Sequence, residues 1–225
     1  MVWNGVVELV CETSRRVREG LSARFEEALA LENETERKLS VVALIDELVQ
    51  RIGFRAIVIG GLAVEFWTYG EYATADIDLY LPHGPAVDDL LAELGFEKRG
   101  RHWVQEQHGL FVEAPASIPA DGEEVDEVTL PTGAAALVLA VEDVIVDRLH
   151  QFVAGGHSDV LEQAVALLAV EELDHPRLIE RATQESLRTA LIEVERISLR
   201  LGRGEAVPPW ELHEIARGLR RRGVD

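Results

Sequence analysis

The sequence predicts an α+β fold, in which a small mixed sheet with flanking helices lies between an N-terminal helical arm and a C-terminal helical tail. Three observations predict it. Apolar residues follow helical spacing up to Ile52. Short β-branched runs, separated by glycine and proline, fill the middle of the chain. Helical spacing returns after Val141 and continues to the end. The predicted regions are therefore residues 1–52, 53–140 and 141–225.

The N-terminal arm is predicted to be helical over residues 5–52. Its second half repeats apolar side chains at helical spacing, at Leu39, Val42, Leu44, Ile45, Leu48, Val49 and Ile52. Asn33 and Glu36 stand three residues apart before this run, as a capping residue and an acid of the first turn do. Gly53 follows the run and is the predicted end of the helix.

Short strands and helices are predicted to alternate through the middle region, because apolar runs there are brief and bounded by turn residues. The predicted strands are 55–59, 75–81, 96–99, 102–105, 110–114, 127–130 and 134–140. The predicted helices are 62–69 and 86–94, and residues 117–124 form a loop. In the tail, the predicted helices are 142–153, 160–170, 176–201 and 209–221.

The composition limits the classes of function. Acidic residues number 41 against 22 basic ones, so the net charge is −19 and broad, nonspecific binding to nucleic acid is disfavoured. From His175 onward, ten arginines accompany eight acids. This tail is interpreted either as a solvated helical surface or as a docking strip for an anionic partner, such as the acidic part of a second copy.

The compartment is predicted to be the cytoplasm. Cys11 is the only cysteine, so no internal disulfide can form. No apolar run approaches the roughly 18 residues of a membrane span. The first residues lack a basic segment, so they do not resemble a signal peptide. The seven histidines show no metal-ligand spacing and are interpreted as surface or loop residues.

The most informative segment is Ala56-Ile-Val-Ile-Gly60-Gly61, followed by Thr74-Ala-Asp76-Ile-Asp78-Leu-Tyr-Leu81. In a strand, residues at i and i+2 point to the same face, so Asp76 and Asp78 are expected side by side. Two adjacent carboxylates repel each other unless a cation lies between them. A glycine pair at the start of a helix suits a phosphate group. Together these features predict a site for a metal ion and a nucleotide.

Glu113 is the candidate for a third carboxylate. It interrupts the apolar run Leu110-Phe111-Val112-Glu113-Ala114, where a charge needs a reason. Two Mg²⁺ ions held by three carboxylates supply most of what phosphoryl or nucleotidyl transfer requires. Taken alone, Glu113 is equally well interpreted as an exposed position on an edge strand.

Val58-Ile-Gly60-Gly61, with the helix and then Thr74-x-Asp76-Ile-Asp78-Leu, resembles the nucleotidyltransferase superfamily of polymerase-beta type. Within it, the chain is most similar to the small prokaryotic group that includes nucleotidyltransferase toxins of abortive-infection type. Val112-Glu113-Ala114-Pro115 and the helix opening at Glu142-Asp143 also resemble that group. The resemblance covers roughly residues 40–170.

The resemblance implies a nucleotidyltransferase-type sheet and a Mg²⁺-dependent transfer of a nucleoside monophosphate from a nucleoside triphosphate (NTP) to an acceptor. Two Mg²⁺ ions would be bridged by Asp76 and Asp78. Glu113 would complete one metal site and help to orient or deprotonate the acceptor hydroxyl. Gly60 and Gly61 would let the backbone approach the β- and γ-phosphates. Residue Thr74 is expected to fix the turn before the metal strand.

The phosphate clamp is the weakest part of the resemblance. Related sequences often carry a basic residue two positions before the threonine, where this chain has Tyr72, and the chain has only two lysines, Lys38 and Lys98. Arg148 is the candidate clamp, with a structural arginine that pairs with a core carboxylate as the alternative.

The sequence leaves three classes of acceptor as alternatives: an RNA end, a protein hydroxyl and a small molecule. Other candidate partners are an antitoxin and a second copy of the chain. Two further hypotheses are a catalytically inactive binding or interaction module with the same fold, and a helical partner-binding protein whose α/β portion is only a scaffold.

Overall fold

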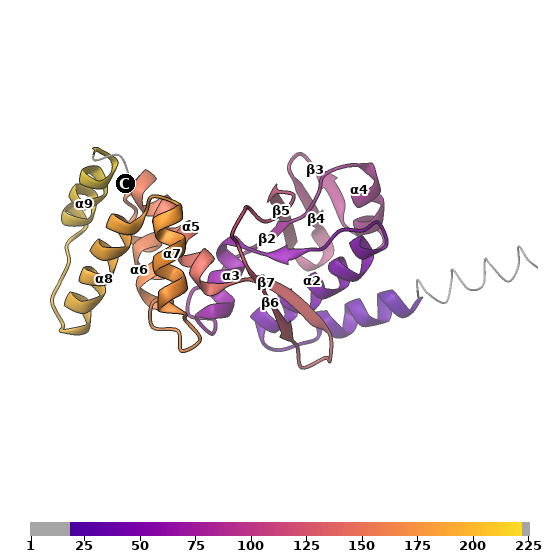
Figure 1. The fold of residues 1–225 in the computed structure, drawn as a ribbon. Coiled ribbons are helices and arrows are strands. Elements are labelled where there is room, and N and C mark those ends of the chain that lie inside the picture. Colours follow the sequence, from indigo (N-terminus) through magenta and orange to yellow (C-terminus); the bar gives the residue numbers. More distant parts are fainter. Residues whose placement is uncertain (1–18, 222–225) are drawn as a thin grey trace, which may run out of the picture. The chain divides into compact units, whose positions relative to one another are not determined.

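The computed structural model describes residues 19–221, and within them a seven-stranded mixed sheet is accompanied by helices, which confirms the predicted fold class (Figure 1). Residues 19–29 are helical and continue the predicted arm, whereas its residues 5–18 lie outside the described part. None of the helices in the described part is both long and apolar enough to cross a membrane.

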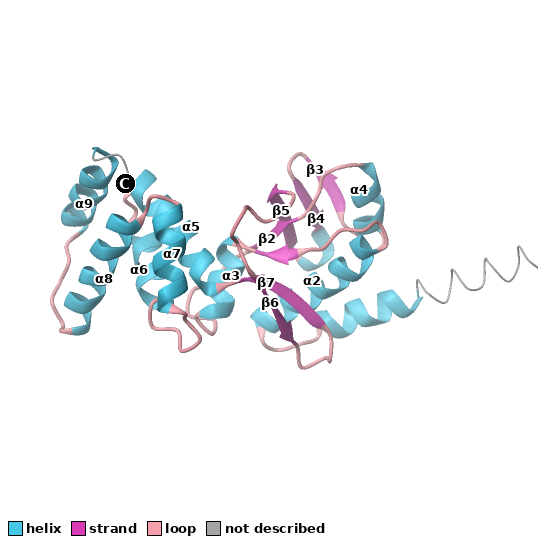
Figure 2. Ribbon diagram, viewed as in Figure 1, coloured by secondary structure: helices cyan, strands magenta, loops and turns pink. Residues whose placement is uncertain are grey.

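The strands are short (Figure 2), and all seven in the described part lie between residues 57 and 139. Their bounds are β1 Ile57–Val58, β2 Asp76–Tyr80, β3 Glu97–Arg99, β4 His102–Gln105, β5 Leu110–Ala116, β6 Val125–Thr129 and β7 Ala135–Leu139. The helices are α2 Glu34–Gln50, α3 Gly60–Trp67, α4 Pro85–Ala92, α5 Val141–Gly155, α6 Ser158–Leu167, α7 His175–Gln184, α8 Arg188–Gly202 and α9 Pro209–Arg221, with a 3₁₀ turn at Glu106–His108.

The sheet order is β3-β4-β5-β2-β1-β7-β6. Strand β2 runs parallel to β5, and β1 runs parallel to β7. The pairs β1–β2, β3–β4 and β4–β5 are antiparallel. The two parallel pairs join strands distant in sequence, which places β2 beside β5 near the middle of the sheet.

One face of this sheet is apolar because alternate residues of each strand point to it. Ile77 on β2, Val112 on β5 and Trp103 on β4 are fully buried there. The indole of Trp103 donates to Asp88 Oδ1 over 2.7 Å, which joins this face to α4. The charged residues of the same strands therefore lie on the opposite face.

Helix α2 starts at the predicted cap and is tied to the sheet by a buried acid. Asn33 Oδ1 accepts a hydrogen bond of 3.0 Å from the backbone of Glu36, which confirms the cap. Asp46 is buried in α2 and accepts from the backbone of Ala56 at 2.7 Å and from the side chain of Arg55. These bonds set where the chain enters β1.

The chain forms two compact units. The sheet unit contains residues 19–58, Ala75–Ile118 and Glu127–Val138, and the helical unit contains Ile59–Thr74, Pro119–Asp126 and the chain from Leu139 onward. Helix α3 belongs to the helical unit although it directly follows β1.

The predicted single helix over 176–201 is wrong, because the chain breaks between α7 and α8. Ser186 has a φ of 58°, in the left-handed region. The backbone of Leu187 then donates to the carbonyl of Ala182 over 2.6 Å, which closes α7 as a Schellman motif does. Serine occupies the position that glycine usually marks, so the sequence carries no obvious stop signal there.

Candidate functional site

The aspartates of β2 share one face of the strand, as predicted. Ile77 and Leu79 are fully buried, whereas Asp76 is exposed and Asp78 is half-buried. The alternation follows from the pleat of the strand, which sends neighbouring side chains to opposite faces. The two carboxylates therefore lie on the face that is not used for packing against α4.

Strand β5 brings Glu113 next to this pair. In the parallel β2–β5 ladder, Asp78 is the partner of Glu113 and Asp76 is the partner of Phe111. Paired residues on neighbouring strands are about 5 Å apart between Cα atoms and share a face. The register therefore puts Glu113 beside Asp78, although residues 81–109 separate the two strands in sequence.

Two basic side chains contact Glu113, and the sequence interpretation missed both. His102 Nε2 lies 3.1 Å from Glu113 Oε2, and Arg101 Nη1 lies 3.2 Å from Oε1. His102 is the antiparallel partner of Glu113 across β4 and β5, so it extends the row from Asp78 through Glu113. The turn at Gly100 predicts a hairpin that contains Arg101 and His102. The sequence does not show the register in which that hairpin pairs with β5.

The donor set suits a magnesium ion that is shared with a ligand. Within residues 19–221, no three His, Cys, Asp or Glu side chains are placed to hold a metal ion together. Mg²⁺ is, however, commonly bound by one or two carboxylates together with phosphate oxygens. Asp76 and Asp78 fit that arrangement, and no three-carboxylate cage is formed with Glu113.

The glycine pair begins α3 in the helical unit. Gly60 has a φ of 59°, which favours glycine. A Cβ on Gly61 would lie 2.9 Å from Thr74 Oγ1, so the threonine side chain fills the space beside this glycine. The backbone of Thr74 donates to Glu65 Oε2 over 2.8 Å, and Glu65 is buried on α3. Thr74 is thus held against the first turns of α3.

Arg148 is buried in the helical unit and contacts neighbouring side chains. Its guanidinium donates to Gln163 Oε1 over 3.1 Å and to the carboxylate of Asp147. Its Nε is buried and has no hydrogen-bond partner among the described residues. The contact with Gln163 joins α5 to α6, which is a structural role, and the predicted role at a phosphate stays a prediction.

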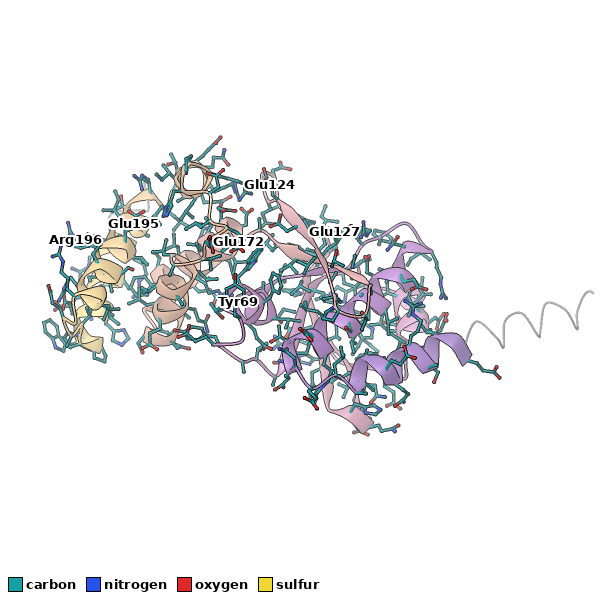
Figure 3. All side chains as sticks on the ribbon, turned by 90° about the horizontal axis from the view of Figure 1, so that it is seen from below. Tyr69, Glu124, Glu127, Glu172, Glu195 and Arg196 are labelled. Carbon is teal, nitrogen blue, oxygen red and sulfur yellow. The ribbon has the colours of Figure 1, made fainter. Side chains whose placement is uncertain are left out.

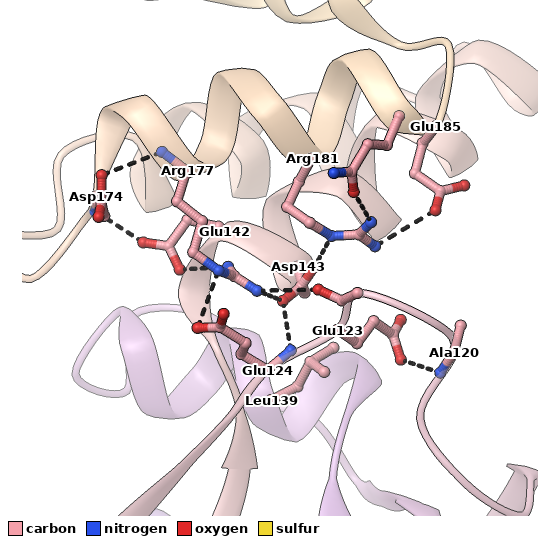
Figure 4. Close-up of polar contacts among 12 residues, drawn as sticks. Ala120, Glu123, Glu124, Leu139, Glu142, Asp143, Asp174, Arg177, Arg181 and Glu185 are labelled. Atoms are coloured by element: carbon pink, nitrogen blue, oxygen red, sulfur yellow. Dashed lines mark hydrogen bonds and ion pairs between the residues drawn. The ribbon is translucent and has the colours of Figure 1, made fainter.

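A buried ion network lies at the start of α5 and was also missed (Figure 4). Arg181 Nε donates to Asp143 Oδ1 over 2.7 Å, and Arg177 donates to Asp143 and, over 2.9 Å, to Glu142 Oε2. The Asp143 side chain is 1% exposed. Burial acts to lower the pKa of both arginines, but the hydrogen bonds and charge of Asp143 outweigh it and the pKa is raised.

Comparison with known proteins supports the fold. No family model matches the chain, and no curated protein matches it. Among solved structures, the chain is similar to an antigenic nucleotidyltransferase-like protein from Paracoccidioides brasiliensis, with a TM-score of 0.52 and 13% sequence identity. The match covers 80% of this chain and 92% of that protein. The chain therefore shares the fold of a nucleotidyltransferase-like protein.

Proposed function

We propose that the protein is a metal-dependent nucleotidyltransferase that moves a nucleoside monophosphate from an NTP to an acceptor. The observation that carries this proposal is the β2–β5 register, which sets Glu113 beside Asp78 on the face that also carries Asp76. The shared fold with a nucleotidyltransferase-like protein supports the same class of reaction.

The proposed chemistry divides between these carboxylates. Asp76 and Asp78 would hold Mg²⁺, which would supply charge neutralisation and orientation for the phosphate under attack. Glu113 orients the acceptor hydroxyl and takes its proton as oxygen attacks the α-phosphorus and pyrophosphate leaves. A second Mg²⁺ would use Glu113 as a ligand. Arg101 is 74% exposed, so its ion pair with Glu113 is weak and can be exchanged for substrate.

The residues assigned to the triphosphate belong to the helical unit. Gly60 and Gly61 are proposed to let the backbone approach the β- and γ-phosphates, while Thr74 holds the following turn. Arg148 is proposed as the phosphate cation. Its buried Nε, which has no hydrogen-bond partner within residues 19–221, supports a role beyond its bond to Gln163.

The acceptor is proposed to be a protein hydroxyl or a small molecule rather than an RNA end. The net charge of −19 disfavours close approach of a polyanion. A place in a toxin–antitoxin pair, with an antitoxin as partner in the cytoplasm, rests on the resemblance of the Gly-Gly and Asp-x-Asp segments alone.

A catalytically inactive binding module is the alternative, and two observations favour it. Glu113 is held by His102 and Arg101, so a cation of the protein already stands where a metal would be needed. Tyr72 occupies the position at which related sequences often have a basic residue. Such a module would bind an NTP and not consume it.

Transfer of label from α-labelled NTPs to a cell lysate, with Mg²⁺, tests the proposal. Asp76→Ala should reduce transfer on the order of 100-fold or more, because a charge that stabilises the transition state is removed. Asp89→Ala is the control, since Asp89 is exposed on α4 and its loss changes the net charge equally. Chelation of Mg²⁺ should abolish transfer.

Equal transfer by wild type and Asp76→Ala would contradict the proposal. If wild type transfers no label but binds an NTP with Mg²⁺ in calorimetry, the binding module is the better description. The same titration with Asp76→Ala then shows whether the β2 carboxylate binds the metal at all.

A further inference from the structure

A pocket of about 320 Å³ opens in the helical unit between the ends of α3 and α6. Trp67, Tyr69 and Glu71 line it from the α3 side, and Val170 and Glu171 line it from the α6 side. This volume lies within the range of roughly 300–1,000 Å³ that small ligands occupy. The pocket is at the opposite end of α3 from Gly60 and Gly61.

Two aromatic side chains are presented at this pocket. The indole of Trp67 donates to the carbonyl of Leu139 over 2.9 Å, and its ring packs edge-on against Phe66, so its position is set. Tyr69 is 81% exposed, and its hydroxyl reaches Glu172 at 3.4 Å (Figure 3). The exposed ring of Tyr69 and the half-buried ring of Trp67 therefore both offer aromatic surface to a ligand in the pocket.

The surroundings of the pocket are acidic. The charge of Glu172 is the main cause that raises the pKa of Tyr69, followed by burial, and Glu171 adds to it. Burial raises the pKa of Tyr72, and the charges of Glu71 and Glu162 raise it further. Among the described residues that line the pocket there is no lysine or arginine.

The backbone at the pocket adds to the negative potential of these carboxylates. Helix α3 ends at Trp67 and helix α6 ends at Leu167, so both helices end at the pocket. The carbonyl end of each helix carries a partial negative charge of about one half. Carboxylates, helix ends and aromatic rings therefore all favour the same kind of ligand.

We propose that this pocket binds a small organic cation through its ammonium or guanidinium groups. The faces of Trp67 and Tyr69 attract such a cation by cation–π contact, and Glu71 and Glu171 pair with it. The aromatic rings would not favour binding of a hydrated metal ion. The volume of about 320 Å³ fits a small amine better than a peptide chain. The site stands independently of nucleotidyl transfer, since it shares none of the residues assigned to that reaction.

Titration calorimetry of the full chain with spermidine tests the proposal. Wild type should bind, and Tyr69→Ala and Glu171→Gln should each weaken binding about fivefold or more, because each removes one of the attractions on the cation. Tyr69→Phe keeps the ring and should stay within about twofold. Glu214→Gln is the control, because Glu214 is exposed on α9 and its loss changes the net charge as Glu171→Gln does.

Four outcomes would overturn the proposal. The first is that wild type does not bind spermidine at physiological salt. The second is equal weakening by Glu171→Gln and Glu214→Gln, which would show diffuse attraction to an acidic protein. The third is that Mg²⁺, at matched ionic strength, fully displaces spermidine while Tyr69→Ala does not change spermidine binding. A lysine-rich hexapeptide that binds through the same residues more tightly than spermidine would also overturn it, in favour of a protein partner.

Discussion

The Thr74 side chain leaves no room for a side chain at position 61, where the sequence has glycine. The threonine methyl and hydroxyl fill the space beside the glycine, and Glu65 holds the threonine backbone in place. Glycine is normally a poor residue inside a helix, by about 1 kcal/mol relative to alanine. Its presence in the first turn of α3 is therefore explained by close packing as well as by any approach of a ligand.

Gly61→Ala is expected to lower the free energy of unfolding by about 1–3 kcal/mol, because the new Cβ meets Thr74 Oγ1 at 2.9 Å. The loss should shrink when Thr74→Ala is added, since the crowded oxygen is removed. Chemical denaturation measures both. Gly202→Ala, on α8 with open space around it, should be neutral or stabilising by up to about 1 kcal/mol. Equal losses at Gly61 and Gly202 would contradict the packing explanation.

At the scale of elements, the start of α5 is held by several hydrogen bonds and ion pairs within the helical unit. Its first-turn acids, Glu142 and Asp143, accept from two arginines of α7, and the backbone of Glu124 donates to Asp143 over 3.0 Å. Acids in the first turn also suit the dipole of α5. A buried charge of this kind is stable only while its partners remain, because an unpaired ion is costly to bury.

Asp143→Ala is expected to lower the free energy of unfolding by about 3–5 kcal/mol, because it leaves the buried guanidinium of Arg181 and the partly buried one of Arg177 without their shared partner. Asp143→Leu combined with Arg181→Met should lose less than Asp143→Ala, since the buried charge is removed together with its partner. Arg196→Ala is the comparison, because its pair with Glu193 is 66% exposed on the arginine side and should contribute about 0–1 kcal/mol. Urea unfolding of these variants measures the difference, and a loss below about 1 kcal/mol for Asp143→Ala would show that the network contributes little.

The sequence predicts elements better than it predicts the contacts between them. The alternation at Asp76-Ile77-Asp78 and the cap at Asn33 are local features, and both are confirmed. The network of Asp143 with Arg181 depends on a meeting of residues 38 apart, which no local pattern indicates. The end of α7 at Ser186 was missed because serine rarely adopts a positive φ.

The same distinction holds for the candidate site. Glu113 was predicted because a charge interrupted an apolar strand. His102 was not, because its place beside Glu113 depends on the register of β4 to β5. Sequence periodicity predicts which face a residue occupies, and only the assembled sheet shows which residues stand opposite each other.

At the scale of the whole molecule, several arginines of the tail contact the protein's own acids and carbonyls. Arg200 pairs with Glu205 and Glu211, and Arg220 donates to the carbonyl of Ala154 over 2.7 Å. This favours the interpretation of the tail as a solvated helical surface. A docking strip would need guanidinium groups that point to a partner.

The full chain is therefore expected not to bind transfer RNA or polyphosphate at physiological salt. The net charge of −19 opposes the approach of a polyanion, and the internal contacts of Arg200 and Arg220 reduce what the tail can offer against it. Electrophoretic mobility shift at about 150 mM salt, with protein up to about 10 μM, checks this against nonspecific affinities of roughly 10⁻⁴–10⁻⁶ M. Salt-dependent binding that Arg217→Glu abolishes would restore the docking strip.

The parallel pairing of β2 with β5 has a consequence for the order of events in folding. Asp78 and Glu113 can meet only when the chain between them, which carries α4 and the β3–β4 hairpin, is closed into a loop. Contacts between such distant residues form late and slowly, because the entropy of loop closure is lost before the contact is gained. The negative charges of Asp78 and Glu113 also first repel each other when β2 pairs with β5. The carboxylate row is thus acquired together with the native sheet, and a partly folded chain has the aspartates without their glutamate.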